Sequence, residues 1–348
     1  MRRKRKWLHV AVVLMLSLSV ALAACSSSKD VGGKDGKTGK IVLYSPETPD
    51  MSKELAQAFE KAFSGSKVDD QYGGTSVIVN KLIAEKSSPK ADVWYGGGGI
   101  FPFESAKSKD IITSYTPEYA KDWKVVQNGI KMRDDDWDWV GVNVFVLGFI
   151  YNTDLVKKED APKTWDDLLD PKWKGKVQMP NPAASGTATL TVLSQLMKRG
   201  DDEGWKYFEK LVEQTNAIPD SGLAPSQAVA KGEAEVAIAF DFMAYEMQGR
   251  GESVDFVVPD ETPILVNPAT LVKDGPNPEG GKQLIDYLLS KEGQELFAKW
   301  YMIPIRDDVE SKTPLNLEKV LPHAQDLDYD WVVKNYDRIR EEWQEKFD

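Results

Sequence analysis

The chain has 348 residues, of which 28% are charged, and its 55 acidic residues outnumber 44 basic ones for a formal net charge of −11. This acidic balance excludes nucleic acid as an expected partner, because a phosphate backbone is bound through clustered Lys and Arg. The single cysteine excludes an intrachain disulfide and any metal or redox site built from cysteine pairs.

Residues 1–24 have the pattern of an export signal. Five basic residues fall within the first six positions, and an apolar or small-residue stretch of 18 residues runs from Trp7 to Ala24. A lone cysteine, Cys25, follows directly and resembles the lipobox of bacterial lipoproteins, in which this thiol receives a diacylglycerol and becomes the mature N-terminus. The alternative is an uncleaved membrane anchor, for which 18 residues lie at the short end.

Residues 25–39 are expected to form the lipidated cysteine and a flexible linker, because Ser, Gly, Lys and Asp dominate them and they have no apolar face. The "GKT" at Gly36 does not complete a phosphate-binding loop, since Val31 stands where that motif needs glycine. Without the five basic signal residues, 39 basic residues face 55 acidic ones, a net charge near −16. The roughly 300 residues that remain exceed what one core usually supports, so two lobes are expected.

The first predicted elements alternate between strand and helix, which favours a parallel sheet with crossover helices. Apolar runs predict strands within 40–45, 67–74 and 91–99, and apolar residues at helical spacing predict helices within 50–65 and 75–86. Three small-residue loops, "SPET", "GGTS" and "GGGG", adjoin these strands. Ligands of open α/β sheets lie beyond the carboxyl ends of strands, so the three loops are expected to face one crevice.

The alternation repeats after residues 139–152, an apolar stretch long enough to cross between lobes. A short helix with a Thr164–Asp167 capping box, a strand, and helices at 190–199 and 203–214 are predicted next. The remaining predicted elements are a strand near 217, a helix at 225–233, strands at 234–240 and 263–273, and helices at 278–290, 291–301 and 328–343. We expect residues 40–140 with 268–348 to form lobe 1 and 141–267 to form lobe 2, with hinge strands at both ends.

Catalytic residues are not expected. The mature chain has one histidine, His323, and no GxSxG motif from which a nucleophile could be recognised. Asp134, Asp136 and Asp138 have calcium-loop spacing, but Trp139 and Phe145 occupy the positions that need Gly and Glu. A solvated acidic turn, and no metal site, is therefore expected there.

The stretch "PNPAASGTATL" places Ser185, Gly186 and Thr187 at the expected start of a helix. Unpaired amides and the helix dipole favour an anion at such a start, and glycine allows close approach. An ordinary N-cap explains the same residues equally well at this stage. Ser221 and Gly222 precede a second helix start. The second lobe is therefore expected to have two helix N-termini that are preceded by small polar residues.

These segments together are similar to the solute-binding proteins of ABC importers, in the branch that includes ferric-ion, phosphonate and sugar-phosphate receptors. The stretches that carry the resemblance span nearly all of residues 40–306, and are "IVLYS", "ADVWYGG", "VLGFIYNTDLV", "PKTWDDLLDPKWKGKVQMPNPAASGTA", "SGLAPSQAVAKGEAEVAIAF" and "LVKDGPNPEGGKQLIDYLLSKEGQELFAKW". The resemblance implies an α/β, two-lobed periplasmic-binding-protein-like fold of type II, with a mixed, mostly parallel sheet flanked by helices in each lobe.

The resemblance also implies a set of pocket residues, which are Ser45, Thr75, Ser76, Gly97, Ser185, Gly186, Thr187, Ser221, Asp241 and Tyr245. Asp241 could receive an ammonium or hydroxyl group, or could simply cap the next helix. Ferric receptors carry adjacent tyrosines after the strand "AEVAIAF"; here Phe242 and Met243 stand there, and no Tyr-Tyr pair occurs in the chain. Direct iron binding is therefore not expected.

The expected function is an extracytoplasmic solute-binding protein, held to the cell membrane by a lipid on Cys25. It would capture a small anionic solute bearing phosphate or phosphonate and deliver it to an ABC permease, as a monomer without cofactors. The alternatives are a ferric-ion or metal-chelate binder, a receptor that only senses, and an extracytoplasmic enzyme.

Overall fold

The computed structural model describes residues 39–347, so the predicted signal, Cys25 and nearly all of the linker lie outside the described residues. Within this range no helix combines the length and apolar character that a membrane crossing requires. Among the described residues, eleven strands belong to one hydrogen-bonded network, in which eight form a continuous path and three pair beside it, and two further strands form a separate ribbon.

The main strand path follows a mixed order. It runs β2 (Lys67–Tyr72), β1 (Lys40–Ser45), β3 (Val93–Tyr95), β12 (Ile264–Val272), β7 (Val140–Asn152), β10 (Val236–Phe240), β8 (Val177–Gln178) and β9 (Thr215–Ala217). Short strands β4 (Ile112–Thr113), β11 (Val254–Val257) and β13 (Ile303–Pro304) pair with β12 or β7, and β5 (Val126–Gln127) pairs with β6 (Ile130–Lys131). Strands β1–β3 are mutually parallel, as are β8–β10, whereas β7 and β12 run antiparallel to their partners. The mixed sheets that the sequence predicted are confirmed.

Strand β7 belongs to both halves of this path. Its first part, from Val140 to Val146, pairs with β12, and its second part, from Leu147 to Asn152, pairs with β10 and β11. All 13 of its residues are buried, which agrees with an unbroken apolar run rather than an alternating one. We call the elements around β1–β4 and β12 the first group, and those around β8–β11 the second group.

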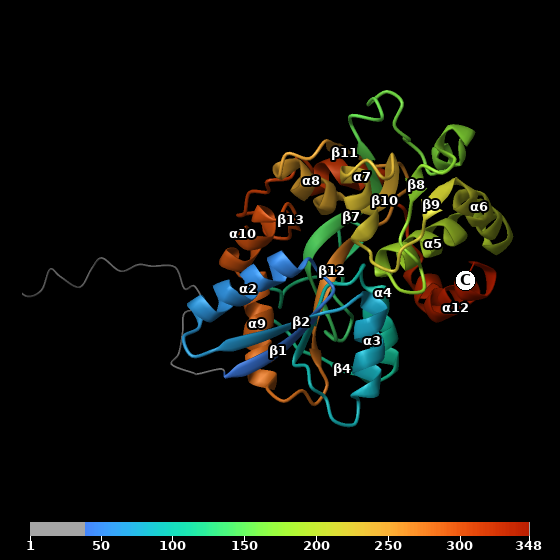
Figure 1. Cartoon of the computed structure of the whole chain (residues 1–348). Coiled ribbons are helices and arrows are strands. Elements are labelled where there is room, and N and C mark those ends of the chain that lie inside the picture. Colours follow the sequence, from blue (N-terminus) through green and yellow to red (C-terminus); the bar gives the residue numbers. More distant parts are fainter. Residues whose placement is uncertain (1–38, 348) are drawn as a thin grey trace, which may run out of the picture. The chain divides into compact units, whose positions relative to one another are not determined.

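Helices cover the sheets of both groups (Figure 1). Those of the first group are α2 (Pro49–Ala62), α3 (Thr75–Ala84), α4 (Phe101–Ser108), α9 (Pro278–Leu289) and α10 (Lys291–Lys299). Those of the second group are α5 (Gly186–Arg199), α6 (Asp201–Gln214), α7 (Ala224–Ala230) and α8 (Asp241–Gly249). A short α11 (Leu317–Val320) precedes α12 (Tyr329–Phe347), which contacts both α4 and α5.

Local sequence explains where the helices begin and which face they bury. In α2, Met51, Leu55 and Phe59 recur every four residues and are fully buried. The predicted capping box is confirmed: the Thr164 hydroxyl accepts from Asp167 N at 3.2 Å, and the Asp167 carboxylate accepts from Thr164 N at 2.9 Å. It opens two short 3₁₀ turns, Asp166–Leu169 and Pro171–Trp173.

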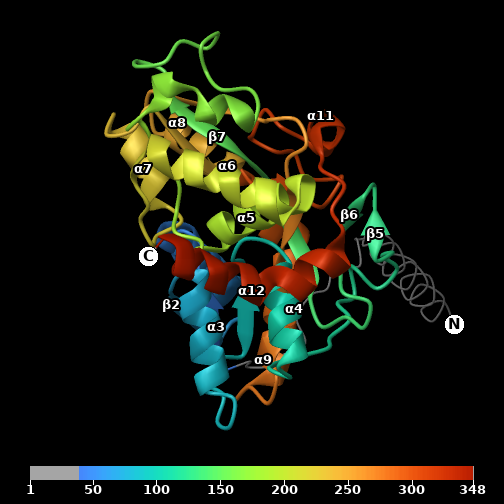
Figure 2. The ribbon, with the colours of Figure 1, turned by 90° about the vertical axis from the view of Figure 1, so that its right-hand side faces the viewer.

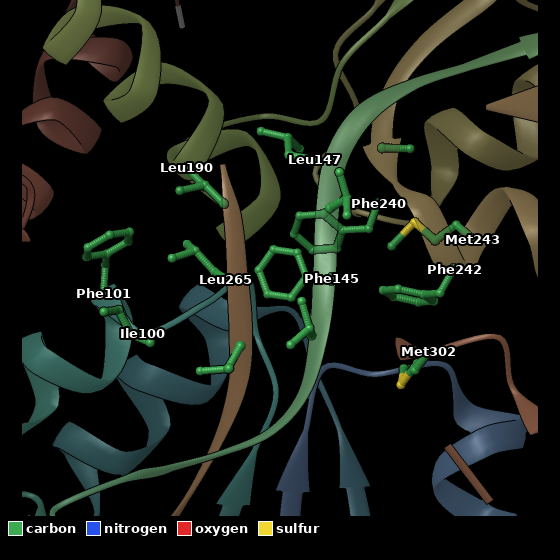
Figure 3. Packing of buried hydrophobic residues seen from close by; sticks show 14 of the residues in the cluster. Ile100, Phe101, Phe145, Leu147, Leu190, Phe240, Phe242, Met243, Leu265 and Met302 are labelled. Atoms are coloured by element: carbon green, nitrogen blue, oxygen red, sulfur yellow. The ribbon is translucent and has the colours of Figure 1, made fainter. Parts of the chain in front are cut away.

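Apolar side chains fill the space where the two groups meet (Figure 3). Phe145 of β7 packs on Phe240 of β10 with ring centroids 4.2 Å apart, and both rings are buried. A methyl group added at Gly99 would lie 3.0 Å from Leu265 and 3.5 Å from the Phe145 ring. The four-glycine loop after β3 therefore rests directly on this shared core.

Glycine at position 148 is required by close packing on β7. A Cβ there would lie 2.4 Å from the Val257 carbonyl oxygen and 2.6 Å from the Phe256 ring. We expect Gly148→Ala to lower the free energy of unfolding by about 1 to 3 kcal/mol through overpacking, as urea denaturation would measure. Gly73→Ala is the control, since a Cβ there meets only ordinary contacts from 3.4 Å outward; equal losses in both variants would contradict the argument.

Candidate functional site

Three loops of the first group converge as the sequence predicted. They follow β1, precede α3 and follow β3, and glycines at 96–99 all have φ between 82° and 122°, a region that favours glycine. A Cβ at Gly97 would lie 3.2 Å from both Pro46 and Thr75. The Thr75 hydroxyl donates to the Gly97 carbonyl at 3.2 Å, which ties two of the loops together.

The start of α5 meets these loops from the second group. A Cβ at Gly186 would lie 2.3 Å from the Gly97 carbonyl oxygen and 3.0 Å from the Thr75 hydroxyl. A Cβ at Gly98 would lie 2.6 Å from the Gly186 carbonyl carbon. Only glycine on both sides allows the two backbones to approach this closely.

Ser76 adds polar contacts between the groups. Its hydroxyl donates to the Ala183 carbonyl at 3.0 Å, and its amide donates to the Ala184 carbonyl at 3.4 Å. Both acceptors precede α5, so the loop before that helix is held against the start of α3.

The start of α5, which we call the α5 mouth, carries two hydroxyls, on Ser185 and Thr187, that form no hydrogen bond with the rest of the described chain. Ser185 occupies the N-cap position, yet its side chain makes no capping bond, and both Ser185 and Thr187 are 5% exposed. A Cβ at Gly222 would lie 2.9 Å from the Ser185 hydroxyl and 3.6 Å from that of Thr187. The helix start, its two hydroxyls and the Ser221–Gly222 turn therefore lie together, and Ser185 is not an ordinary N-cap.

Two other predicted residues use their hydroxyls in local turns. The Ser45 hydroxyl accepts from Glu47 N at 3.2 Å, and the Ser221 hydroxyl accepts from Leu223 N at 3.3 Å. Ser45 is buried, whereas Ser221 is exposed. Both side chains shape the loops beside the α5 mouth.

Asp241 and Tyr245 lie one helical turn apart at the start of α8. Asp241 is fully buried; one carboxylate oxygen accepts from Val146 N at 2.8 Å, while the other has no partner among the described residues. Burial raises the pKa of Asp241 to about 7 and is also the main cause that raises the pKa of Tyr245. Neither residue shares a hydrogen bond with the α5 mouth, so the structure does not bring these two into the polar cluster.

Glu47 is a site residue that the sequence reasoning did not single out, although it had placed the "SPET" loop at the crevice. Its side chain lies against the glycine loop, where a Cβ at Gly96 would be 2.3 Å from a carboxylate oxygen. Burial raises the pKa of Glu47 to about 7, against the smaller opposing effect of a backbone hydrogen bond from Gly97. A charged residue directly after a buried strand, in a loop aimed at the crevice, was the signal that could have identified it.

The acidic turn at residues 134–138 differs from the expected solvated turn. The Lys107 ammonium lies 2.9 Å from Asp134, 3.2 Å from Asp136 and 3.1 Å from Asp138, and the Asp134 side chain is only 2% exposed. A lysine thus occupies the centre of a group of carboxylates that could otherwise hold a cation. The sequence spacing missed this because Lys107 comes from α4, far away in the chain.

The chemistry that the α5 mouth offers is hydrogen bonding to an anion. Amides at a helix start carry partial positive charge, and two hydroxyls without partners can donate beside them.

Comparison with known proteins identifies the family. The sequence model of a family described as "Bacterial extracellular solute-binding protein" matches residues 88–332, well over half of the chain. The chain belongs to this family. Its members bind solutes and are not enzymes, and the expected α/β periplasmic-binding-protein fold is confirmed by solved structures.

Three similar proteins illustrate the range of relatives. A Salmonella typhimurium periplasmic protein, provisionally named for 2-aminoethylphosphonate binding, is 32% identical over 72% of this chain and 73% of its own length. The periplasmic binding protein AfuA from Actinobacillus pleuropneumoniae, solved with fructose 6-phosphate, has a TM-score of 0.79 at 28% identity and covers 88% of this chain and 98% of its own. Iron uptake protein A1 from Synechocystis is 26% identical over 81% of this chain and 80% of its own length.

The buried carboxyl of Glu47 gives a pH test. Its folded-state pKa, about 7, lies above the ordinary 4.5, so the folded chain keeps a proton that the unfolded chain releases between these values. The stability that this carboxyl contributes is therefore full below about pH 4.5 and is lost as the pH rises to about 7, by about 3 kcal/mol. Glu47→Gln should flatten the decline between pH 5 and 8 in urea denaturation, and the exposed control Glu213→Gln should leave it unchanged.

Proposed function

We propose that this protein captures a small solute bearing phosphate or phosphonate and delivers it to the permease of an ABC importer. The observation that carries the proposal is the start of α5, where the hydroxyls of Ser185 and Thr187, residues that are each 5% exposed, form no hydrogen bond within residues 39–347. The amides at the helix start add donors, and the glycines at 97 and 186 let the loops of the first group close against this helix start.

The relatives support this class of solute. One is named for an aminophosphonate and another was solved with a sugar phosphate, and the two ligands share a tetrahedral oxyanion group. An oxyanion with several acceptor oxygens suits a site made of hydroxyl and amide donors. The carboxyl of Glu47, which lies against the glycine loop, is the acidic group that we propose for the other end of the solute.

A ferric ion is the second candidate ligand, because an iron uptake protein is among the relatives. Hard trivalent cations prefer phenolate and carboxylate oxygens. The start of α8 supplies Phe242 and Met243 instead of tyrosines, and both are buried in the apolar core (Figure 3). These residues favour an anionic solute over a directly bound metal.

The two groups of elements are proposed to be the lobes, with β7 and β12 as the hinge strands. These strands pair from Ile264↔Val146 to Ala269↔Val140, and their register shifts between Asn267 and Pro268. A ladder that is irregular at its middle can bend there, which would let the lobes close on a solute. A receptor that only senses would use the same closure and lack an importer.

The anion site is tested by removing its two hydroxyls. The Ser185→Ala/Thr187→Ala double variant should weaken binding by about 100-fold, because hydrogen bonds to a charged group each contribute about 1.5 to 3 kcal/mol. Isothermal titration calorimetry with 2-aminoethylphosphonate and fructose 6-phosphate measures this. The control is Ser87→Ala/Thr153→Ala, which removes two hydroxyls from exposed positions. Unchanged affinity in the first variant would refute the site.

The lipid anchor on Cys25 remains a proposal, supported by the lipobox-like "LAAC". A diacylglycerol attached to this thiol would hold the protein at the membrane. We expect the Cys25→Ser variant, produced in a lipoprotein-forming bacterium, to move from the membrane fraction to the soluble exported fraction on immunoblots. Equal membrane retention of both forms would show that another segment anchors the chain.

A further inference from the structure

Helix α12 lies across the seam between the two groups. Figure 2 shows it running between α5 and α6 on one side and α3 and α4 on the other. Its buried residues Val332, Tyr336, Ile339 and Trp343 recur at spacings of four and three, so one continuous face is packed against the protein.

The C-terminal half of α12 is attached to the second group by aromatic packing. Trp343 is fully buried and meets Phe208 of α6 edge-on, with ring centroids 5.7 Å apart. Phe347 contacts Trp205 at 6.3 Å, and the Trp205 indole donates to Glu342 at 2.9 Å. Such buried contacts are costly to separate, so this half stays with α6.

Beyond its first residue, Tyr329, which packs on Phe101 of α4, helix α12 is joined to the first group by polar side chains. Lys109, which directly follows α4, and Asp337 form an ion pair of 2.8 Å in which both side chains are substantially exposed. Arg340 reaches the start of α3, where its guanidinium donates to the Ser76 hydroxyl at 2.7 Å. The Lys109–Asp337 pair is exposed and the Arg340–Ser76 bond is part-buried, so both can form and break as the groups move more readily than the buried aromatic packing.

Arg340 also donates to the Ala183 carbonyl at 2.9 Å, so one guanidinium nitrogen bonds both groups at once. Ser76 donates to the same carbonyl at 3.0 Å, so Arg340, Ser76 and the Ala183 carbonyl form a junction in which each is hydrogen-bonded to the other two. Ala183 stands two residues before Ser185, at the mouth of α5. The junction therefore fixes the loop that leads into the proposed anion site.

We propose that Arg340 is a positioning residue for solute binding. Its hydrogen bonds to Ser76 and to the Ala183 carbonyl, which we call the clasp, hold the first group against the loop before α5 and so keep the site in its closed form. This inference rests on the proposed function, because the closed form is the one that retains solute. Arg340 acts through Ser76 and Ala183 and not by touching the solute. Its loss lowers the closed fraction, which raises the apparent dissociation constant in proportion.

Stopped-flow fluorescence with 2-aminoethylphosphonate and fructose 6-phosphate provides the first test. Arg340→Gln should release solute about tenfold faster with little change in the association rate, since the clasp forms after encounter. Arg340→Lys, which keeps a donor, should restore part of the loss. The matched control is Arg338→Gln on the same helix, since Arg338 pairs with Asp201 and Glu342 and not with the first group.

A double-mutant cycle distinguishes a clasp from direct solute contact. If Arg340 acts through Ser76, the Ser76→Ala/Arg340→Gln variant should release solute no faster than the more impaired single variant. Fully multiplicative effects of the two substitutions would overturn the proposal.

A second measurement does not depend on the identity of the solute. Spin labels on Ser87→Cys and Lys158→Cys, both at exposed positions, report the separation of the groups in the full chain carrying Cys25→Ser. Without solute, Arg340→Gln should shift the distance distribution towards longer values than the parent or Arg338→Gln. An unchanged distribution would refute the clasp. Failure of the parent protein to bind either phosphorylated probe would refute the proposed function and leave this result standing.

Discussion

The close approach of the Gly97–Gly98 backbone to the start of α5 is the contact on which the site depends. A Cβ on either side would collide with the other backbone. The requirement explains why two loops that are distant in the sequence both carry glycine, and why polar contacts surround them. The hydroxyl of Thr75 and the side chain of Ser76 then fasten loops whose position the glycines have made possible.

Much of the fold could be predicted from local patterns. The apolar run of β7, the four-residue spacing in α2 and the Thr164–Asp167 capping box each depend on neighbours within one element, so the sequence alone identifies them. The start of α5 was harder to place, because Gly186 and Thr187 are poor helix formers. Their helical state depends on packing against the first group.

The site could be predicted only where small residues adjoin strands. Ser185, Gly186, Thr187, Thr75 and Gly97 were proposed in this way, and the structure brings them together. Lys107 and Arg340 were not, because each acts on residues from distant segments, Lys107 on the acidic turn and Arg340 on the α5 loop. The sequence around a lysine or arginine contains no local pattern that identifies the distant residue with which its long side chain will pair. Glu47 was overlooked for another reason: its significance lies in its burial, which depends on the glycine loop folding over it.

The sharing of β7 between two sheets also limits how its length can change. Its residues alternate between two buried faces, so an inserted or deleted residue would reverse the side chains of everything beyond it. An insertion near Val146 would leave the pairing with β12 intact. In the part of β7 that pairs with β10, it would move each side chain to the opposite face of the sheet. Evolution and protein engineering can therefore alter this strand by substitution alone, whereas the exposed loops are free to grow or shrink. The number of residues in β7, from Val140 to Asn152, therefore fixes which side chains face each way in the two halves of the sheet that the strand joins.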